Sequence, residues 1–199
     1  MKTIKLGILG STKGTDLQAI LDAINHGQLN ASVEVVISNR KKAFILQRAR
    51  DHGIDALFIS HKNKSREEFD SEVSREFKER GVQLVLLIGF MRILSAWFCL
   101  QWRNRVMNVH PSLLPAFAGG MDMNVHEEVL KAGVKETGCT IHFVTEDVDA
   151  GPIVVQKQCR VEKDDTPESL KQKVQALEGK AFIEAIELIQ KGKLPQIHA

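Results

Sequence analysis

The feature that most constrains the fold is a regular alternation of short apolar runs and helix-like segments. Apolar runs at 4–9, 33–38, 56–59, 84–88 and 106–110 are separated by helix-like segments at 17–25, 42–52 and 66–80. Strands that alternate with helices form parallel sheets, because each helix returns the chain to the edge where the next strand starts. The run Leu84–Ile88 is apolar at every position, as in a strand buried on both faces.

The pattern changes in the second half of the chain. Two strand-like segments, Thr137–Val144 and Ile153–Val161, have no helix between them and predict an antiparallel hairpin with a loop over 145–152. A last helix is predicted over Pro167–Gln190, because a capping residue and a proline stand at its first turn. The expected fold class is therefore α/β, with a mostly parallel sheet, an antiparallel C-terminal hairpin and helices on both faces.

Length and charge narrow the class of protein. A chain of 199 residues has the length of one domain, so a single domain over residues 1–199 is expected. The net charge of +2 predicts no nucleic-acid or membrane partner, and no run approaches the roughly 20 apolar residues that span a bilayer. Three cysteines without a CxxC pair indicate a reducing compartment. No targeting segment is recognisable, so a cytoplasmic location is expected.

Three polar residues suggest acyl-transfer chemistry. Asn108 and His110 lie two apart at a predicted strand end, so their side chains point to the same side. Downstream, Asp149 precedes Gly151 and Pro152, which fix the loop behind it. A donating amide, a proton-carrying imidazole and a carboxylate that charges the imidazole suit transfer through an oxyanion. A structural histidine and a solvated acidic turn are the plain alternatives.

Several other kinds of chemistry lack their motifs. No serine or cysteine has the context of a nucleophile, so the acyl acceptor is expected to be a substrate amine. No HExxH motif or other metal-ligand spacing is present, and no metal site is predicted.

Two loops are candidates for ligand binding. Gly10–Asp16 follows the first strand and opens a helix, where exposed amides beside Lys13 favour a phosphate. It matches neither GxGxxG nor a Walker A loop, and a plain turn capped by Thr15 or Asp16 is an equal alternative. Gly89–Leu94 leaves the buried strand at the edge where open α/β sheets bind ligands. Its apolar side chains either line a flat ligand pocket or pack in the core, and both alternatives stay open.

Four ordered motifs resemble the folate-dependent formyltransferases. They are Gly89–Leu94, Asn108–Pro115, Gly138–Val144 and Asp149–Pro152, and the similarity runs over nearly the whole chain. The resemblance implies a Rossmann-like formyltransferase fold that transfers the formyl group of 10-formyltetrahydrofolate to an amine. The branch it resembles most formylates glycinamide ribonucleotide in purine synthesis. It implies these two small molecules as partners, no metal, and a monomer or homodimer.

The resemblance also implies a role for each matching residue. The catalytic trio becomes Asn108, His110 and Asp149. Folate contacts fall on Phe90, Met91, Arg92, Ile93, Leu94, Val144 and Asp147. Nucleotide contacts fall on Lys13, Gly14, Thr15, Asp16, Gly89, Pro111, Gln175 and Glu178. The N-terminal half would then carry the nucleotide-phosphate side, and the C-terminal half the folate and catalytic side.

The chain departs from the family pattern in two places. Thr12 replaces a glycine of the phosphate loop and Asp16 replaces an asparagine, which puts a carboxylate near the expected phosphate. The segment Ala118–His126 is longer than the usual loop, with Asn124 where a first histidine would fall. Because it is rich in glycine, a mobile loop is expected there.

Other functions remain open at this point. A formyltetrahydrofolate deformylase shares the trio but gives the formyl group to water, and it carries an extra regulatory domain before the fold. Formyl transfer to another amine is a further alternative. A methionyl-tRNA formyltransferase would need a tRNA-binding domain. A non-catalytic folate or nucleotide binder would not need the intact trio.

Overall fold

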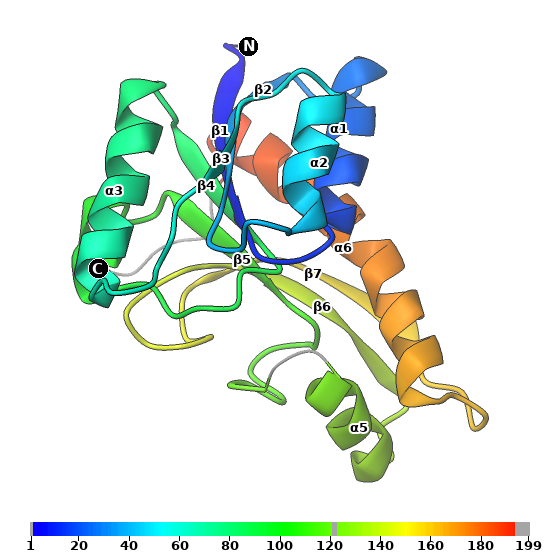
Figure 1. Ribbon diagram of the computed structural model, residues 1–199. Helices are drawn as coiled ribbons and strands as arrows, with labels where there is room; N and C mark the ends of the chain where they lie inside the picture. Colours follow the sequence, from blue (N-terminus) through cyan, green and yellow to red (C-terminus); the bar gives the residue numbers. More distant parts are fainter. Residues whose placement is uncertain (1, 121–122, 194–199) are drawn as a thin grey trace.

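The computed structural model describes residues 2–120 and 123–193 (Figure 1). Its centre is a seven-stranded sheet in the order β3-β2-β1-β4-β5-β6-β7. The strands are β1 (Ile4–Gly10), β2 (Ala31–Ser38), β3 (Ala56–Phe58), β4 (Leu84–Ile88), β5 (Val106–His110), β6 (Glu136–Phe143) and β7 (Ile153–Arg160). The helices are α1 (Thr15–Asn25), α2 (Phe44–Asp51), α3 (Arg66–Glu79), α4 (Ala96–Gln101), α5 (Met123–Ala132) and α6 (Pro167–Gln190).

The strand directions confirm the predicted fold class. Neighbouring strands from β3 to β5 pair parallel, whereas β5 with β6 and β6 with β7 pair antiparallel. Each predicted strand and helix is present, with bounds that differ by one or two residues. The last helix begins as expected, because Thr166 caps it and Pro167 occupies its first turn.

Helices cover both faces of the sheet, with α3 on one side and α1, α2 and α6 on the other (Figure 1). Alternate residues of β4 divide between the two resulting cores. Leu84, Leu86 and Ile88 pack in the core under α1 and α6. Val85 and Leu87 pack in the core under α3 and α4. The uniformly apolar sequence of this strand follows from burial on both faces.

Two helices were not predicted from the sequence. The short α4 follows Gly89–Leu94, the first of the four formyltransferase-like motifs, and Ser95 is its N-cap. The segment expected to be a mobile loop over 118–126 is helical from Met123 onward, so that expectation was wrong for residues 123–126. Residues 121–122 lie outside the described residues. Val125 and Val129, four apart, are buried with Leu170 of α6, and this long-range contact stabilises α5.

The order of the strands places the candidate loops together. From β1 the chain continues to β2 on one side, whereas β4 lies on the other side. Such a reversal of direction is the usual ligand-binding point of an open α/β sheet. The segments after β1, β4 and β5 therefore leave the same edge of the sheet next to one another.

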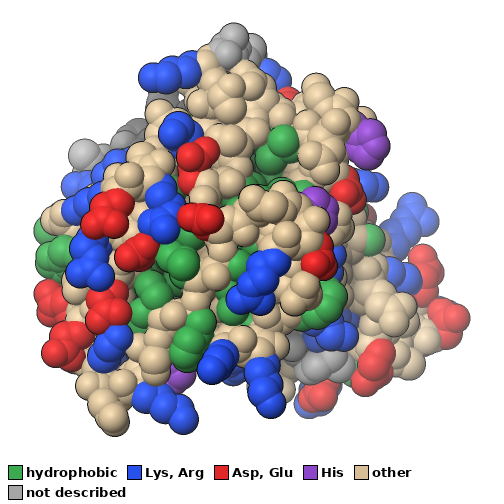
Figure 2. Space-filling model, turned by 45° about the horizontal axis from the view of Figure 1, so that its top comes forward, with side chains coloured by type: hydrophobic (Ala, Val, Ile, Leu, Met, Phe, Trp, Pro, Cys, Tyr) green, Lys and Arg blue, Asp and Glu red, His purple; other side chains and the backbone are tan. Residues whose placement is uncertain are grey.

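The surface carries mixed charge on the face drawn in Figure 2, where lysine and arginine side chains lie among aspartates and glutamates. Pairs such as Arg80 with Glu76 and Lys64 with Glu72 link opposite charges on and beside α3. Within residues 2–120 and 123–193, no helix is long and apolar enough to cross a membrane.

Candidate active site

The predicted catalytic residues meet at the ends of β5 and β6. Asn108 and His110 stand on β5, opposite His142 and Thr140 of the antiparallel β6. Asp149 comes from the loop between β6 and β7, and its Oδ2 atom lies 3.2 Å from Nδ1 of His110. The structure thus brings an imidazole and a carboxylate 39 positions apart in the sequence into contact, with His110 buried and the Asp149 side chain largely covered.

Both ring nitrogens of His110 face hydrogen-bond acceptors. Nδ1 faces the Asp149 carboxylate, and Nε2 lies 2.9 Å from the carbonyl oxygen of Phe117. An imidazole nitrogen must carry a proton to donate to either oxygen. Only a ring with a proton on each nitrogen can donate to both oxygens at once.

Asp149 accepts two hydrogen bonds on its Oδ2 atom. They come from the Gly119 backbone N–H at 2.9 Å and from Nδ1 of His110 at 3.2 Å, while Oδ1 lies 3.5 Å from Nε2 of His142. Burial raises the pKa of Asp149, but the hydrogen bonds from His110 and the Gly119 N–H outweigh it and hold the pKa well below the ordinary value. Asp149 is therefore an ionised partner for His110.

His142 belongs to the site, although it was not among the predicted site residues. Its Nδ1 atom lies 3.0 Å from the Phe143 carbonyl oxygen, to which it donates. In the neutral ring Nε2 is then an acceptor, and the Asn108 side-chain nitrogen lies 3.2 Å from it. His142 therefore fixes the orientation of the Asn108 amide. The motif Gly138–Val144 contains this residue, but only the strand register reveals that it faces Asn108.

The loop that carries Asp149 is built around its glycine. Asp149 has a φ of 54°, a left-handed conformation that is uncommon for residues other than glycine and often marks functional sites. A Cβ atom at Gly151 would lie 1.8 Å from the Phe143 carbonyl oxygen, so no side chain fits there. The Phe143 N–H also donates to the Pro152 carbonyl oxygen at 2.9 Å. Gly151 and Pro152 thus tie the loop to the end of β6.

The segment after His110 is held by side chains of β6 and β7. The Thr140 hydroxyl donates to the Ser112 carbonyl oxygen at 2.7 Å and accepts from the Leu114 N–H at 3.0 Å. The Gln156 side-chain nitrogen donates to the Leu114 carbonyl oxygen and to Thr140, each at 2.9 Å. These bonds fix the backbone that follows His110, and sequence reasoning had not identified Thr140 or Gln156.

Residues 11–16, here named the nucleotide loop, lead into α1. The cap of α1 is Gly14, at φ 69°, and no side chain caps the helix. The alternative of a turn capped by Thr15 or Asp16 is therefore wrong. Gly14 is buried, while Lys13 and Thr15 are exposed on either side of it. A helix N-terminus with amides free of a side-chain cap suits an anion.

Two buried carboxyl groups lie below the nucleotide loop. Asp16 of α1 and Glu178 of α6 are both buried, and Gly179 lets the helices approach, since a Cβ there would lie 2.5 Å from the Ala19 Cβ. Burial, together with the charges of Glu178 and Asp16, raises the pKa of the Cys139 thiol to about 12. Both carboxylates therefore lie near the same point of β6. Burial raises the pKa of Asp16 itself to about 7.

The other residues predicted to contact the nucleotide are Gln175, Pro111 and Gly89. Gln175 is exposed one turn before Glu178 on α6. Pro111 is half-buried directly after His110. Gly89 has a φ of 55°, and a Cβ there would lie 2.1 Å from the Thr12 hydroxyl oxygen. The threonine that replaces the family's usual glycine is thus accommodated by the bare backbone of Gly89.

Residues 89–94, here named the folate loop, leave β4 beside the nucleotide loop. Met91 and Ile93 are exposed, at 37% and 53% of their surface. Phe90 is half-buried and stacks near Phe69 of α3, whose ring also lies 5.3 Å from the Arg92 guanidinium. Leu94 is 5% exposed and packs in the core under α3 and α4, so its side chain is held in the core and its backbone remains the part that could contact a ligand.

The loop across from the folate loop also offers an apolar side chain. Val148 is 53% exposed in the segment that carries Asp149. Val144 is half-buried and packs against the core, and Asp147 is exposed, with its carbonyl oxygen bonded by the Thr145 hydroxyl.

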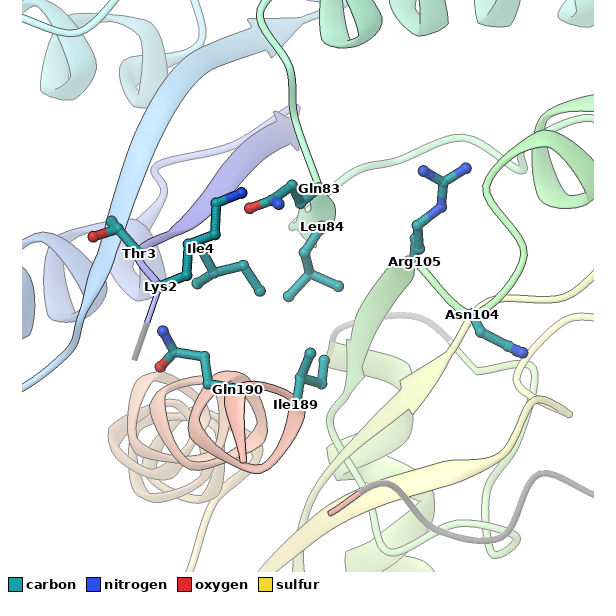
Figure 3. A pocket seen from close by; sticks show the side chains of 9 residues that line it. All are labelled: Lys2, Thr3, Ile4, Gln83, Leu84, Asn104, Arg105, Ile189 and Gln190. Atoms are coloured by element: carbon teal, nitrogen blue, oxygen red, sulfur yellow. The ribbon is translucent and has the colours of Figure 1, made fainter. Parts of the chain in front are cut away.

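A shallow cavity of about 230 Å³ lies at the opposite, amino edge of the sheet (Figure 3). It contains none of the predicted site residues. Its lining comprises Lys2, Thr3, Ile4, Gln83, Leu84, Asn104, Arg105, Ile189 and Gln190. Over the part of the chain that the structure describes, no group of three or more His, Cys, Asp or Glu side chains is arranged to hold a metal ion.

The sequence as a whole matches a known family. The family model described as formyl transferase matches residues 4–186. The chain belongs to the formyl transferase family. Its fold agrees with this membership: it superposes on the crystal structure of glycinamide ribonucleotide transformylase 1 from Symbiobacterium toebii with a TM-score of 0.90 and 42% identity, covering 96% of this chain and 89% of that one.

Curated relatives of this formyl transferase fall into two kinds. Phosphoribosylglycinamide formyltransferase of Escherichia coli is 36% identical over 188 residues, which are 94% of this chain and 87% of the relative. The human trifunctional purine biosynthetic protein adenosine-3 is 41% identical over 192 residues, or 96% of this chain. The chain spans only 19% of the length of that trifunctional relative.

Proposed function

We propose that this formyl transferase moves the formyl group of 10-formyltetrahydrofolate to the amine of glycinamide ribonucleotide. The observation that carries the proposal is the buried His110–Asp149 pair beside Asn108, in which both His110 nitrogens face acceptors. The Escherichia coli and Symbiobacterium toebii relatives, named for this reaction, support the choice of acceptor.

The residues at the carboxyl edge of the sheet fit a folate. Exposed Met91 and Ile93 on one side and exposed Val148 on the other offer apolar contact to a flat ring. The bound folate supplies the formyl carbon. Phe90 and Arg92, held by Phe69, support the backbone of the folate loop rather than project freely. Leu94 acts from within the core, as an anchor of the loop.

The catalytic roles follow from the charges of the trio. Asn108 donates a hydrogen bond to the oxyanion that develops on the formyl oxygen as the amine attacks. The His110 imidazolium stabilises the same charge once Nε2 exchanges the Phe117 carbonyl oxygen for the substrate oxygen. Asp149 keeps His110 cationic and orders a water that carries the proton from the attacking amine to the folate nitrogen, as the bond between that nitrogen and the formyl carbon breaks. Loss of one oxyanion donor of this kind typically costs about a hundredfold in rate.

The nucleotide would occupy the other side of the site. The uncapped amides at Gly14 and Thr15, with Lys13 beside them, suit the phosphate. Glu178 and Gln175 on α6 would face the ribose hydroxyls, with Asp16 below. We also propose that the N-terminal half of one domain supplies the nucleotide-phosphate side and that the C-terminal half supplies the folate and catalytic side.

The alternatives differ in the acceptor. A deformylase would pass the formyl group to water, and another formyltransferase would use a different amine. The uncapped α1 terminus beside the catalytic edge supports a phosphorylated amine over both. The free thiols of Cys99, Cys139 and Cys159 accord with action in the cytoplasm.

The test follows the absorbance change of a 10-formyl folate analogue with and without glycinamide ribonucleotide. Turnover that requires the nucleotide is expected. His110→Ala should abolish that turnover while the analogue still binds, and His26→Ala, at an exposed histidine remote from the trio, is the matched control. Equal turnover without the nucleotide would identify a hydrolase instead.

A further inference from the structure

The nucleotide loop and the folate loop meet at Ser11, directly after β1. The Ser11 backbone N–H donates to the Gly89 carbonyl oxygen at 3.1 Å. Its hydroxyl oxygen accepts a hydrogen bond from the Met91 backbone N–H at 3.0 Å. Ser11 therefore belongs to one loop by sequence and is bonded to the other by both its backbone and its side chain.

The orientation of the Ser11 hydroxyl is set from the next strand. The hydroxyl donates its single proton to Oδ1 of Asn39, just after β2, at 2.7 Å. Because that proton is taken by Asn39, the lone pairs of the oxygen are left to accept from Met91. Ser11 and Asn39 are only 3% and 5% exposed, so water does not readily replace either bond.

The contacts extend to a fourth strand end. The Asn39 side-chain nitrogen lies 3.4 Å from Nδ1 of His61, which follows β3. Polar contacts thus run across the carboxyl ends of β3, β2, β1 and β4, which are neighbours in the sheet. They converge on one hydroxyl group at the reversal point between β1 and β4.

We propose that Ser11 is a positioning residue that holds the folate loop at Met91 while being oriented by Asn39. The inference rests on the proposed function, since it assigns the two loops to the two substrates. Among the residues that the structure describes, the hydrogen bonds of Ser11 reach Gly89, Met91 and Asn39, and none reaches Asn108, His110 or Asp149. Its contribution therefore falls on binding and not on the chemical step.

The test measures the dissociation constant of a 10-formyl folate analogue by calorimetry, for the wild type and Ser11→Ala, each without nucleotide. Loss of the acceptor leaves the Met91 N–H unsatisfied, and the analogue should bind about tenfold more weakly. The rate at saturating concentrations of both substrates should stay within about twofold. An unchanged dissociation constant would overturn the proposal, as would a variant whose only defect is in the saturated rate.

Two further variants separate positioning from packing. Ser11→Cys keeps nearly the same volume but offers a weak acceptor, and it should weaken the analogue as Ser11→Ala does. Ser38→Ala is the matched control, because Ser38 is buried next to Asn39 but its hydroxyl bonds to the Arg40 backbone. It should leave the dissociation constant unchanged, and equal weakening in this control would overturn the specific role of Ser11.

A double-mutant cycle tests the relay through Asn39. Asn39→Ala should weaken analogue binding in the wild-type background and have little further effect in Ser11→Ala. Fully additive effects would contradict the relay. A wild-type chain that binds the analogue but shows no nucleotide-dependent turnover would refute the proposed function, whereas the affinity comparison would still decide the role of Ser11.

Discussion

His142 lies directly across the β5–β6 pair from Asn108, with its Nε2 atom 3.2 Å from the Asn108 amide nitrogen. The same Nε2 atom is 3.5 Å from the Asp149 carboxylate. One buried imidazole therefore contacts two members of the proposed trio. The site is better described as four residues than as three.

The first prediction concerns His142. His142→Ala should lower kcat by about tenfold, because Asn108 loses the partner that orients it but remains present. The Michaelis constants of both substrates should change little. His142→Gln, whose amide oxygen can accept the same bond, should recover part of the loss. A rate loss in His142→Ala that adds fully to that of Asn108→Ala would show that the two side chains act independently.

The second prediction concerns Asp149. Asp149→Asn removes the negative charge that stabilises the His110 imidazolium, and kcat should fall by about a thousandfold or more. Binding of the folate analogue alone should weaken only slightly. Asp164→Asn, at an exposed carboxylate between β7 and α6 that belongs to neither substrate site, is the control and should keep nearly full activity. Steady-state measurements of kcat for the wild type and the two variants test this. Comparable losses of kcat in both variants would show that the Asp149 charge has no specific role in stabilising His110.

The third prediction concerns the pH dependence that Asp16 introduces. Burial raises the pKa of Asp16 to about 7, so the carboxyl group is neutral below that pH and charged above it. Above pH 7 the carboxylate should oppose the phosphate, and the Michaelis constant of the nucleotide should rise by up to about tenfold per pH unit. Asp16→Asn should remove this rise. The Michaelis constant of the folate should follow the same pH profile in the wild type and in the variant.

Asp16 also has a predicted effect on stability. The folded pKa lies above the unfolded value of 3.8, so the folded chain keeps a proton that the unfolded chain releases. Its contribution is therefore most favourable below about pH 4 and is lost as pH rises to about 7. Asp16→Asn should stabilise the fold more at pH 8 than at pH 5, by roughly 2 kcal/mol. Denaturant unfolding at the two pH values measures this, and an equal effect at both would argue against the raised pKa.

The fourth prediction concerns Gly151. A Cβ there would meet the Phe143 carbonyl oxygen, so Gly151→Ala must displace the loop that carries Asp149. We expect a loss of about 2 kcal/mol or more in unfolding free energy and a strong loss of kcat. Gly27→Ala is the control, because it has a positive φ but open space around the new atom, and it should cost about 1 kcal/mol with normal kcat. Unimpaired activity in Gly151→Ala would show that the loop tolerates the shift.

The elements of the fold were predictable because their signals are local. Leu84–Ile88 is apolar at each position, and Thr166 with Pro167 marks a helix start. Helix α5 was missed, since its stability depends on Val125 and Val129 meeting Leu170, about 40 residues later. Tertiary burial, rather than propensity, decided that segment.

For the site, the residue pattern is enough to predict that Asn108 and His110 share one side of a strand and that Gly151 and Pro152 fix a loop, because strand periodicity and backbone sterics are local properties. The three-dimensional fold was needed to show that His142 faces Asn108, that Leu94 is buried and that Ser11 joins two loops. These relationships depend on strand register and on the packing of distant segments. Local sequence patterns do not determine them, because they follow from the free energy of the whole fold.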